Sequence, residues 1–227
     1  MDYLFINYGL LFLGMIITVM AQIFVSSSYS KYKKVNNKNG LTGLEVARKI
    51  LDENGLKDIH IVEIQGNLTD HYDPTRKVVR LSSDIFNGSS IASTSVAAHE
   101  CGHAIQDKDN YTFMRIRSKM VPFVNLSSKL GYLAITIGII FSLFDLAIFG
   151  IVLLLAILAF QLVTLPVEFD ASNRAAEQIK KLKLLDETEK GKSKTMLNAA
   201  AFTYVASLVT TLLEILRLFL IANSRRD

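Results

Sequence analysis

The feature that most constrains this chain is a run near its amino terminus that contains no charged side chain. From Tyr3 to Val25, YLFINYGLLFLGMIITVMAQIFV runs for 23 residues without Asp, Glu, Lys or Arg. A helix of about 20 apolar residues crosses the roughly 30 Å hydrocarbon core of a bilayer. The run is too long for the apolar core of a secretory signal peptide and lacks a basic start. We therefore expect a retained transmembrane anchor.

Two further apolar blocks predict more membrane helices. Residues 130–167 are about twice the length of one span and are interrupted once, by Asp145, which predicts a helical hairpin with Asp145 in its turn. Residues 196–222 are also apolar but contain Glu214 and Arg217, which are spaced to pair on one helix face. This block either crosses as a fourth span or packs on the bundle, so the sequence predicts three or four spans.

The basic residues indicate how such a chain is oriented. Residues 26–119 contain 14 Lys and Arg and residues 168–195 contain 7, whereas the amino terminus and the Asp145 turn contain none. The positive-inside rule then predicts a multi-pass protein of the cell membrane with both charged segments on the cytoplasmic side. Four crossings would leave the SRRD tail outside, so either the last helix does not cross or this tail is an exception. The basic residues form no stripe with aromatics, which argues against a nucleic-acid partner.

The segment between the anchor and the hairpin predicts a small α+β domain. LTGLEVARKILDENGL has apolar residues at helical spacing, with Thr42 as N-cap and Gly55 as a stop. DIHIVEIQG and KVVRLSSDIF are β-branched runs on either side of NLTDHYDPTR, whose DPTR has turn chemistry, so we expect a hairpin in a sheet of about three strands. Residues 91–106 predict a further helix, capped by Ser89 or Ser90.

That further helix contains the sequence His-Glu-Cys-Gly-His. Because each helical residue turns about 100°, His99 and His103 lie stacked on one face and can bind one ion together. Glu100 lies at the edge of this face, where it can accept a proton from a metal-activated water. Cys101 points to the opposite side, so we expect it to pack in the core. Catalytic zinc takes three protein ligands and keeps one position for water, so a third ligand must come from elsewhere.

The candidates for the third ligand are His60, His71, Glu168, Asp170 and Glu177. Glu168 directly follows an apolar span, where an unpaired carboxylate is costly and a ligand role explains its presence. Asp170 lies about 200° further round the same helix and cannot face the same ion. Ser172 or Asn173, at the next turn, are better placed to support the ligand histidines. His71 is a candidate catalytic residue that could donate to the oxyanion of the reacting carbonyl. His60 is interpreted as a strand residue without a role.

Four stretches together resemble the bacterial membrane neutral zinc metallopeptidases of the YugP-like type: LTDHYDPTRKVVRLSSDIF, SVAAHECGHAIQD, RIRSKMVPFVN and LPVEFDASNRA. The order of elements is distantly similar to that of the CAAX-processing and heat-shock membrane metallopeptidases. The resemblance implies His99, His103 and Glu168 as Zn²⁺ ligands and Glu100 as base. Those relatives have an Asp four residues after the ligand Glu, where this chain has Ser172. The resemblance also implies KVVRLSSD as a sheet edge that binds extended substrate.

The sequence therefore predicts an α+β fold with a zincin-like catalytic domain joined to a helical membrane bundle. The predicted function is a membrane-bound zinc endopeptidase that acts beside the lipid bilayer on polypeptides, membrane-associated ones among them. Two alternatives stay open, a non-catalytic metal-binding scaffold or sensor and a hydrolase of a non-peptide amide or lipid. The predicted division is an anchor (1–25), two parts of the catalytic domain (26–119 and 168–195), a transmembrane hairpin (120–167) and a probable fourth span (196–222).

Overall fold

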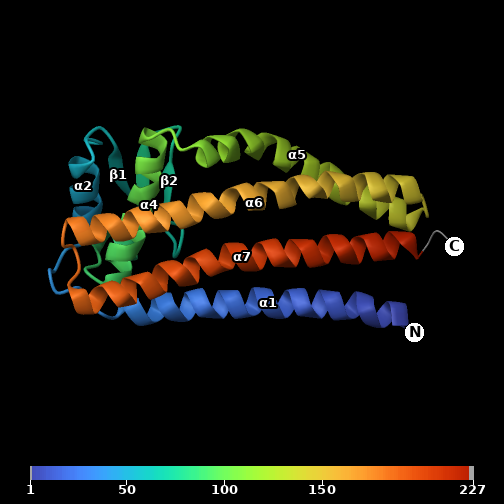
Figure 1. The fold of residues 1–227 in the computed structure, drawn as a ribbon, viewed down its shortest axis with the longest axis horizontal. Helices are drawn as coiled ribbons and strands as arrows, with labels where there is room; N and C mark the ends of the chain where they lie inside the picture. Colours follow the sequence, from blue (N-terminus) through green and yellow to red (C-terminus); the bar gives the residue numbers. More distant parts are fainter. Residues whose placement is uncertain (1, 225–227) are drawn as a thin grey trace. The chain divides into compact units, whose positions relative to one another are not determined.

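The computed structural model of the protein describes residues 2–224. Within these residues the helices are α1 (Asp2–Lys33), α2 (Gly43–Glu53), α3 (Ser83–Asn87), α4 (Ile91–Lys108), α5 (Thr112–Ile140), α6 (Phe144–Lys181) and α7 (Glu187–Asn223). The strands are β1 (His60–Ile64), β2 (His71–Asp73) and β3 (Val78–Ser82). The chain forms two compact units (Figure 1). The helical bundle comprises residues 2–22, 115–165 and 203–224, and the mixed unit comprises Ile23–Met114 and Pro166–Phe202.

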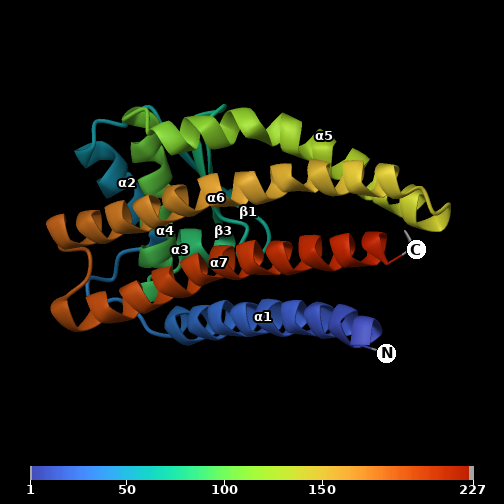
Figure 2. The same ribbon diagram turned by 45° about the vertical axis from the view of Figure 1, so that its right-hand side comes forward.

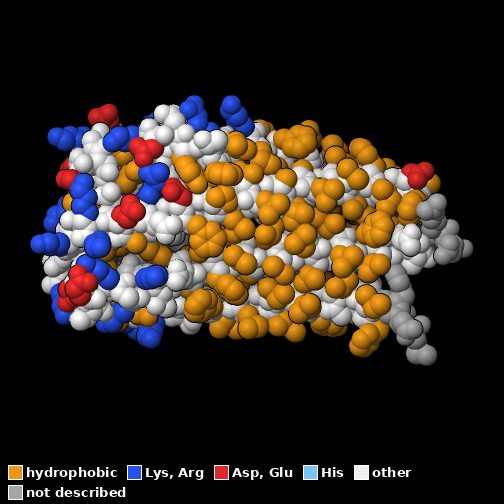
Figure 3. All heavy atoms as spheres, viewed as in Figure 1, with side chains coloured by type: hydrophobic (Ala, Val, Ile, Leu, Met, Phe, Trp, Pro, Cys, Tyr) orange, Lys and Arg blue, Asp and Glu red, His pale blue; other side chains and the backbone are white. Residues whose placement is uncertain are grey.

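The helical bundle consists of segments of α1, α5, α6 and α7, and α7 lies between α1 and α6 in both views (Figures 1 and 2). In the part of the chain that is described, four helices are long and apolar enough to cross a membrane, and they belong to these same elements. Hydrophobic side chains cover the face of the bundle seen in Figure 3, and few charges interrupt them. The prediction of three or four membrane helices in an α+β protein is confirmed. The SRRD tail lies mostly outside the described residues.

Helices α5 and α6 form the predicted hairpin, with differences at its ends. α5 starts at Thr112, before the predicted start of the hairpin at residue 120 and of the apolar block at residue 130, so the basic segment is the first part of one continuous helix. The turn lies at residues 141–143, and Asp145 belongs to the first turn of α6 instead of the connection. An acidic side chain there is favourable because the helix dipole is positive at this end. A Cβ on Gly150 would lie 2.6 Å from the Gly131 carbonyl oxygen, so glycine is required for this close helix approach.

The mixed unit contains one three-stranded sheet, in which β3 is the central strand. β2 pairs antiparallel with β3 through the turn that the sequence predicted, with Tyr72 opposite Val79. β1 pairs parallel with β3, so the prediction of a hairpin between the two longest strands was wrong. The connection from Ile64 to Val78 is long enough for a parallel crossover and contributes β2 itself. The expected edge position of KVVRLSSD was also wrong, because the sheet edges are β1 and β2.

Helix α4 is held in the core of the mixed unit by α2, α3 and the sheet. α2 begins with the predicted Thr42 cap, which forms a full capping box with Glu45. α4 begins with Ser90, whose hydroxyl accepts from the Ser93 amide at 3.0 Å. At its other end, Asp107 accepts a hydrogen bond of 2.8 Å from the Tyr72 hydroxyl of β2. The helix that carries the histidines is therefore fixed at both ends.

Cys101 lies in this core, as its position on α4 predicted. Its side chain has no exposed surface, and its thiol donates to the Ala47 carbonyl at 3.6 Å. Burial also raises the pKa of the thiol well above its ordinary value, which leaves little reactive thiolate. We expect maleimide to modify native protein about 10³-fold or more slowly than unfolded protein, because reaction requires unfolding of the unit.

Labelling in increasing denaturant, followed by mass spectrometry, measures this difference. Asn67→Cys, in the exposed connection between β1 and β2, is the positive control and should react in the native protein. Fast labelling of Cys101 in native wild-type protein would contradict the buried position.

Candidate metal centre

Two helices of the mixed unit bring three metal-ligating side chains to one point. His99 and His103 project from α4, and Glu168 projects from α6. The Glu168 Oε2 atom lies 3.4 Å from His99 Nε2 and 3.6 Å from His103 Nε2. One ligand atom from each residue lies within 4.8 Å of the other two. Among the described residues, the structure assigns no other His, Cys, Asp or Glu side chain to such a group.

Close contact between α4 and α6 sets this geometry. A Cβ on Gly102 would lie 2.5 Å from the Ala171 carbonyl oxygen, so the backbones of the two helices are in direct contact. Glu168 and Ser172 are one turn apart on the α6 face that meets α4. The Ser172 hydroxyl lies 3.2 Å from His99 Nδ1. Of the two predicted supporting residues, Ser172 and Asn173, only Ser172 makes a hydrogen bond to a histidine of the group.

The second histidine is oriented by a residue that the sequence analysis did not select. Gln106 has no exposed surface, and its Nε2 atom donates to the Val167 carbonyl oxygen at 2.8 Å. Because a carbonyl oxygen only accepts, this bond fixes Gln106 Oε1 as the atom that lies 2.9 Å from His103 Nδ1. His103 must then carry its proton on Nδ1, which leaves the Nε2 lone pair directed toward Glu168. The i, i+3 spacing of His103 and Gln106 was the signal in the sequence that could have identified Gln106.

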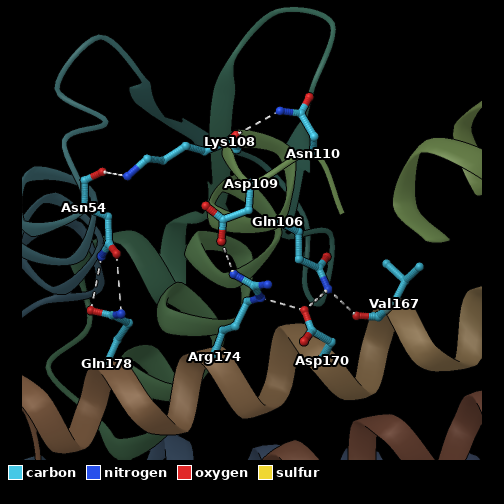
Figure 4. Close-up of polar contacts among 9 residues, drawn as sticks. All are labelled: Asn54, Gln106, Lys108, Asp109, Asn110, Val167, Asp170, Arg174 and Gln178. Atoms are coloured by element: carbon cyan, nitrogen blue, oxygen red, sulfur yellow. Dashed lines mark hydrogen bonds and ion pairs between the residues drawn. The ribbon is translucent and has the colours of Figure 1, made fainter. Parts of the chain in front are cut away.

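Asp170 belongs to this supporting network rather than to the group of three. Its Oδ2 atom accepts from Gln106 Nε2 at 2.8 Å and from Arg174 Nε at 2.6 Å (Figure 4). Arg174 also donates to Asp109 at 2.6 Å, which ties α6 to the end of α4. The prediction that Asp170 and Glu168 cannot face the same point agrees with this arrangement. The network does, however, connect Asp170 to His103 through Gln106.

Glu100 is buried beside the histidines on α4, with 7% of its surface exposed. Burial raises the pKa of its carboxyl above the ordinary value, although the His99 and His103 rings act in the opposite direction. The carboxylates of Glu168 and Asp70 raise it further. Asp70 was not selected from the sequence, although it directly precedes His71. It accepts hydrogen bonds from the Ser82 amide at 2.7 Å and hydroxyl at 3.0 Å, at the end of β3.

The remaining candidates from the sequence lie outside the group of three. His71 is exposed on β2, where its Nδ1 atom lies 2.8 Å from the Thr69 carbonyl oxygen and its Nε2 atom 3.3 Å from Arg80 Nη1. His60 is exposed on β1, and Glu177 is exposed on α6. The oxyanion role of His71 stays a prediction.

Comparison with known proteins agrees with this geometry. The family model described as "Putative neutral zinc metallopeptidase" matches residues 7–223 of the chain. The chain belongs to this family. It is 44% identical over 207 residues to a protein of Bacillus subtilis (strain 168) described as "Putative membrane protease YugP", covering 91% of this chain and 92% of that protein. No solved structure matches the chain.

The three side chains fit the zinc ion that membership of a zinc metallopeptidase family implies. Zinc binds histidine nitrogen and carboxylate oxygen at about 2.0–2.2 Å in tetrahedral geometry, which places neighbouring ligand atoms about 3.4 Å apart. The two separations from Glu168 Oε2, 3.4 and 3.6 Å, agree with this value. Both histidines also have a hydrogen-bond partner at Nδ1, which leaves Nε2 for the ion. Two histidines and one glutamate are a common ligand set of catalytic zinc.

Proposed function

We propose that the chain is a membrane-bound zinc endopeptidase in which His99, His103 and Glu168 hold the metal and Glu100 is the general base. The observation that carries this proposal is the convergence of the three side chains at ligand spacing, with a buried carboxylate next to them on α4. Membership of a neutral zinc metallopeptidase family supports it. A site built only to bind metal would not need Glu100.

Each residue has a defined task in this reaction. Bound zinc lowers the pKa of a water molecule toward about 7 and polarises the scissile carbonyl. Glu100 takes a proton from the attacking water and delivers it to the leaving amine. Gln106 holds the His103 imidazole in the tautomer that presents Nε2 to the metal, and Ser172 orients the His99 ring by a hydrogen bond at Nδ1.

Extended substrate is proposed to bind along β2 rather than β3. β3 is paired on both sides, whereas β2 has one free edge. Tyr72 on β2 donates a hydrogen bond to Asp107 of α4, so this edge strand contacts the helix that carries His99 and His103. Addition of a strand to such an edge supplies backbone hydrogen bonds without requiring a particular sequence.

The location is proposed from the distribution of charge. The Lys-rich and Arg-rich segments favour a cytoplasmic position for residues 26–119 and 168–195, with residues 1–25, 120–167 and 196–222 as membrane segments. Polypeptides in or at the membrane are the substrates that this arrangement favours.

Metal removal tests the proposal directly. Purified protein is expected to contain one zinc per chain by elemental analysis and to cleave a casein-like substrate. A chelator should abolish cleavage, and added zinc should restore it, because no protein group replaces the metal as the activator of water. Cleavage that persists in metal-free protein would contradict the proposal. Bound zinc without cleavage would favour the scaffold or sensor alternative.

The role of Gln106 leads to a prediction on metal affinity. Gln106→Met keeps the side-chain volume but removes the acceptor for His103 Nδ1, so the imidazole is no longer fixed. We expect zinc affinity to fall about 10–100-fold, the range found for residues that orient metal ligands. Competition with a fluorescent zinc chelator measures the change.

Gln178→Met is the matched control for this variant. Gln178 of α6 also lies in the mixed unit, but it bonds to Asn54 and not to a histidine (Figure 4). Its zinc affinity should be that of the wild type. Equal zinc affinity of the two variants would show that Gln106 does not support the metal site.

A further inference from the structure

A partly open cavity of about 360 Å³ is lined by residues of α5, α6 and α7. All of its described lining residues belong to the bundle segments of these helices, so the cavity is formed within one unit. Ligand sites in proteins have volumes of about 300–1,000 Å³, so a cavity of this size can hold the headgroup of a lipid. The proposed peptidase chemistry does not use any of these residues.

The wall of the cavity is polar at one end and apolar farther along the helices. The bundle segments of α5, α6 and α7 end at residues 115, 165 and 203, where the chain continues into the mixed unit. Arg117, Thr164 and Tyr204 line the cavity within two residues of these ends, which is about 3 Å along a helix. Val124 and Ile157 line it nine and eight residues from the same ends. This distribution fits an amphipathic molecule whose polar part lies at the end of the membrane segment.

Arg117 gives the polar end of the cavity a positive charge. Among the described residues of the lining there is no Asp or Glu and no second basic residue. An arginine guanidinium binds a phosphate group through two parallel hydrogen bonds, and it recognises this group better than a lysine does. Basic pockets between membrane helices at the cytoplasmic side are typical sites for anionic headgroups. The charge of the cavity therefore favours an anionic lipid.

Gln161 of α6 gives the same cavity an unused hydrogen-bond acceptor. Its Nε2 atom donates to Ser207 Oγ and to Thr211 Oγ1, both at 2.9 Å. Its Oε1 atom is buried and has no hydrogen-bond partner within residues 2–224. A buried amide oxygen without a partner costs free energy, and Gln161 lines the cavity, so an occupant with an O–H or N–H donor is favoured.

The apolar part of the wall accounts for the rest of such a molecule. Val124, Ile157 and Phe160 present hydrocarbon surface to the cavity. Ser128 also lies in this part, but its hydroxyl donates to the Asn125 carbonyl of the same helix at 3.2 Å. An acyl chain therefore fits here. A neutral membrane helix fits the cavity less well, because it would bring no counter-charge for the guanidinium.

We propose that this cavity binds an anionic glycerophospholipid with a hydroxylated headgroup, of the phosphatidylglycerol type. Arg117 binds the phosphate, Gln161 Oε1 accepts a hydrogen bond from a headgroup hydroxyl, and Val124 and Ile157 contact the first part of an acyl chain. The inference goes beyond the proposed function, because lipid binding requires neither the metal nor cleavage. It rests only on the bundle lying in the membrane.

Lipid titration of the full-length protein tests the charge contact. Protein in a non-ionic detergent is titrated with dioctanoyl phosphatidylglycerol, and native mass spectrometry measures the bound fraction. Arg117→Gln should raise the dissociation constant about tenfold or more, because a charge-assisted contact to phosphate is lost. Arg117→Lys should retain part of the affinity, because lysine also binds phosphate as a point charge.

Arg115→Gln is the matched control for this variant. It removes the same charge from α5, about 200° round the helix from Arg117 and outside the residues that line the cavity. Its dissociation constant should stay within about twofold of wild type, the effect of an exposed charge. Equal losses in Arg115→Gln and Arg117→Gln would overturn the proposal. Equally tight binding of phosphatidylethanolamine and phosphatidylglycerol by wild type would overturn it as well.

A second lipid tests the contact with Gln161. Phosphatidylmethanol has the charge of phosphatidylglycerol but no hydroxyl on its headgroup. Wild-type protein should bind phosphatidylglycerol about tenfold more tightly than phosphatidylmethanol, because only the former satisfies the buried oxygen. Gln161→Met should bind the two lipids equally. Equal affinities for the two lipids in wild type would refute the proposal, and this comparison does not depend on the folding of any variant.

The same spectra distinguish another occupant. A dimer that forms without added lipid, that is lost in Arg117→Gln and that phosphatidylglycerol does not dissociate would assign the cavity to a second copy and overturn the lipid proposal. No step of these measurements involves cleavage. Failure of the peptidase function therefore leaves the result on lipid binding unaffected, and failure of lipid binding leaves the peptidase proposal unaffected.

Discussion

Glu100→Gln is expected to lower kcat/KM for peptide cleavage about 10²–10⁴-fold, the contribution of a positioned general base. The amide has nearly the same shape as the carboxylate but cannot accept the proton of the attacking water. Zinc content should remain at one per chain, because Glu100 is not among the three side chains at ligand spacing. The paired measurement is casein cleavage and elemental analysis on the same protein sample.

The matched control for this variant is Glu177→Gln. Glu177 is an exposed glutamate on α6, so its substitution removes a carboxylate without affecting the centre. Activity and zinc content should both stay at wild-type values. If Glu100→Gln cleaves casein as fast as wild type, Glu100 is not the base and the enzyme proposal loses its main support.

Glu168→Gln is expected to lower zinc affinity more than about 100-fold, beyond the range for a residue that only orients a ligand. Its Oε2 atom is the point at which the two histidines converge, and a neutral amide is a weak zinc ligand. Asp170→Asn should remain near wild type, because its amide oxygen still accepts from Arg174 or Gln106. Zinc loss in Asp170→Asn with retention in Glu168→Gln would make Asp170 the ligand.

The sequence predicted the grouping of His99, His103 and Glu168 better than it predicted the pairing of the strands. Helical periodicity places His99 and His103 on the same face of one helix. Glu168 directly follows an apolar span, where an unpaired carboxylate is costly, so the sequence favoured a ligand role for it. Local patterns of this kind specify which face a residue occupies. The i, i+3 spacing places Gln106 beside His103, but Gln106 was missed because its orientation depends on the Val167 carbonyl of another helix, which the sequence of α4 does not reveal. Asp70 was missed for the same reason, since its partner Ser82 lies at the end of β3.

The sheet shows the limit of strand propensity. Residues 60–64 and 78–82 were recognised as strands, but a β-branched run does not specify its neighbour or its direction. The predicted turn connects β3 to the short strand β2 at residues 71–73, and these two strands pair antiparallel. The longer strand β1 therefore pairs with the other side of β3, in parallel. The edge position inferred for residues 78–82 failed for this reason. The start of α5 was missed because the apolar block begins only at residue 130, whereas the helix begins at Thr112 in the basic segment before it.

Glu168 lies on α6, late in the chain, and this position has a consequence for biosynthesis. The nascent chain contains His99 and His103 at least 65 residues before it contains Glu168. At about 5–20 residues per second, translation of this interval takes roughly 3–13 s, during which the two histidines have no glutamate partner. The intervening segment is the α5–α6 hairpin, so completion of the centre follows synthesis of two apolar helices. A chain stalled before the hairpin is complete therefore contains His99, Glu100 and His103 but not Glu168, and an abortive fragment of this protein lacks the complete group of three residues.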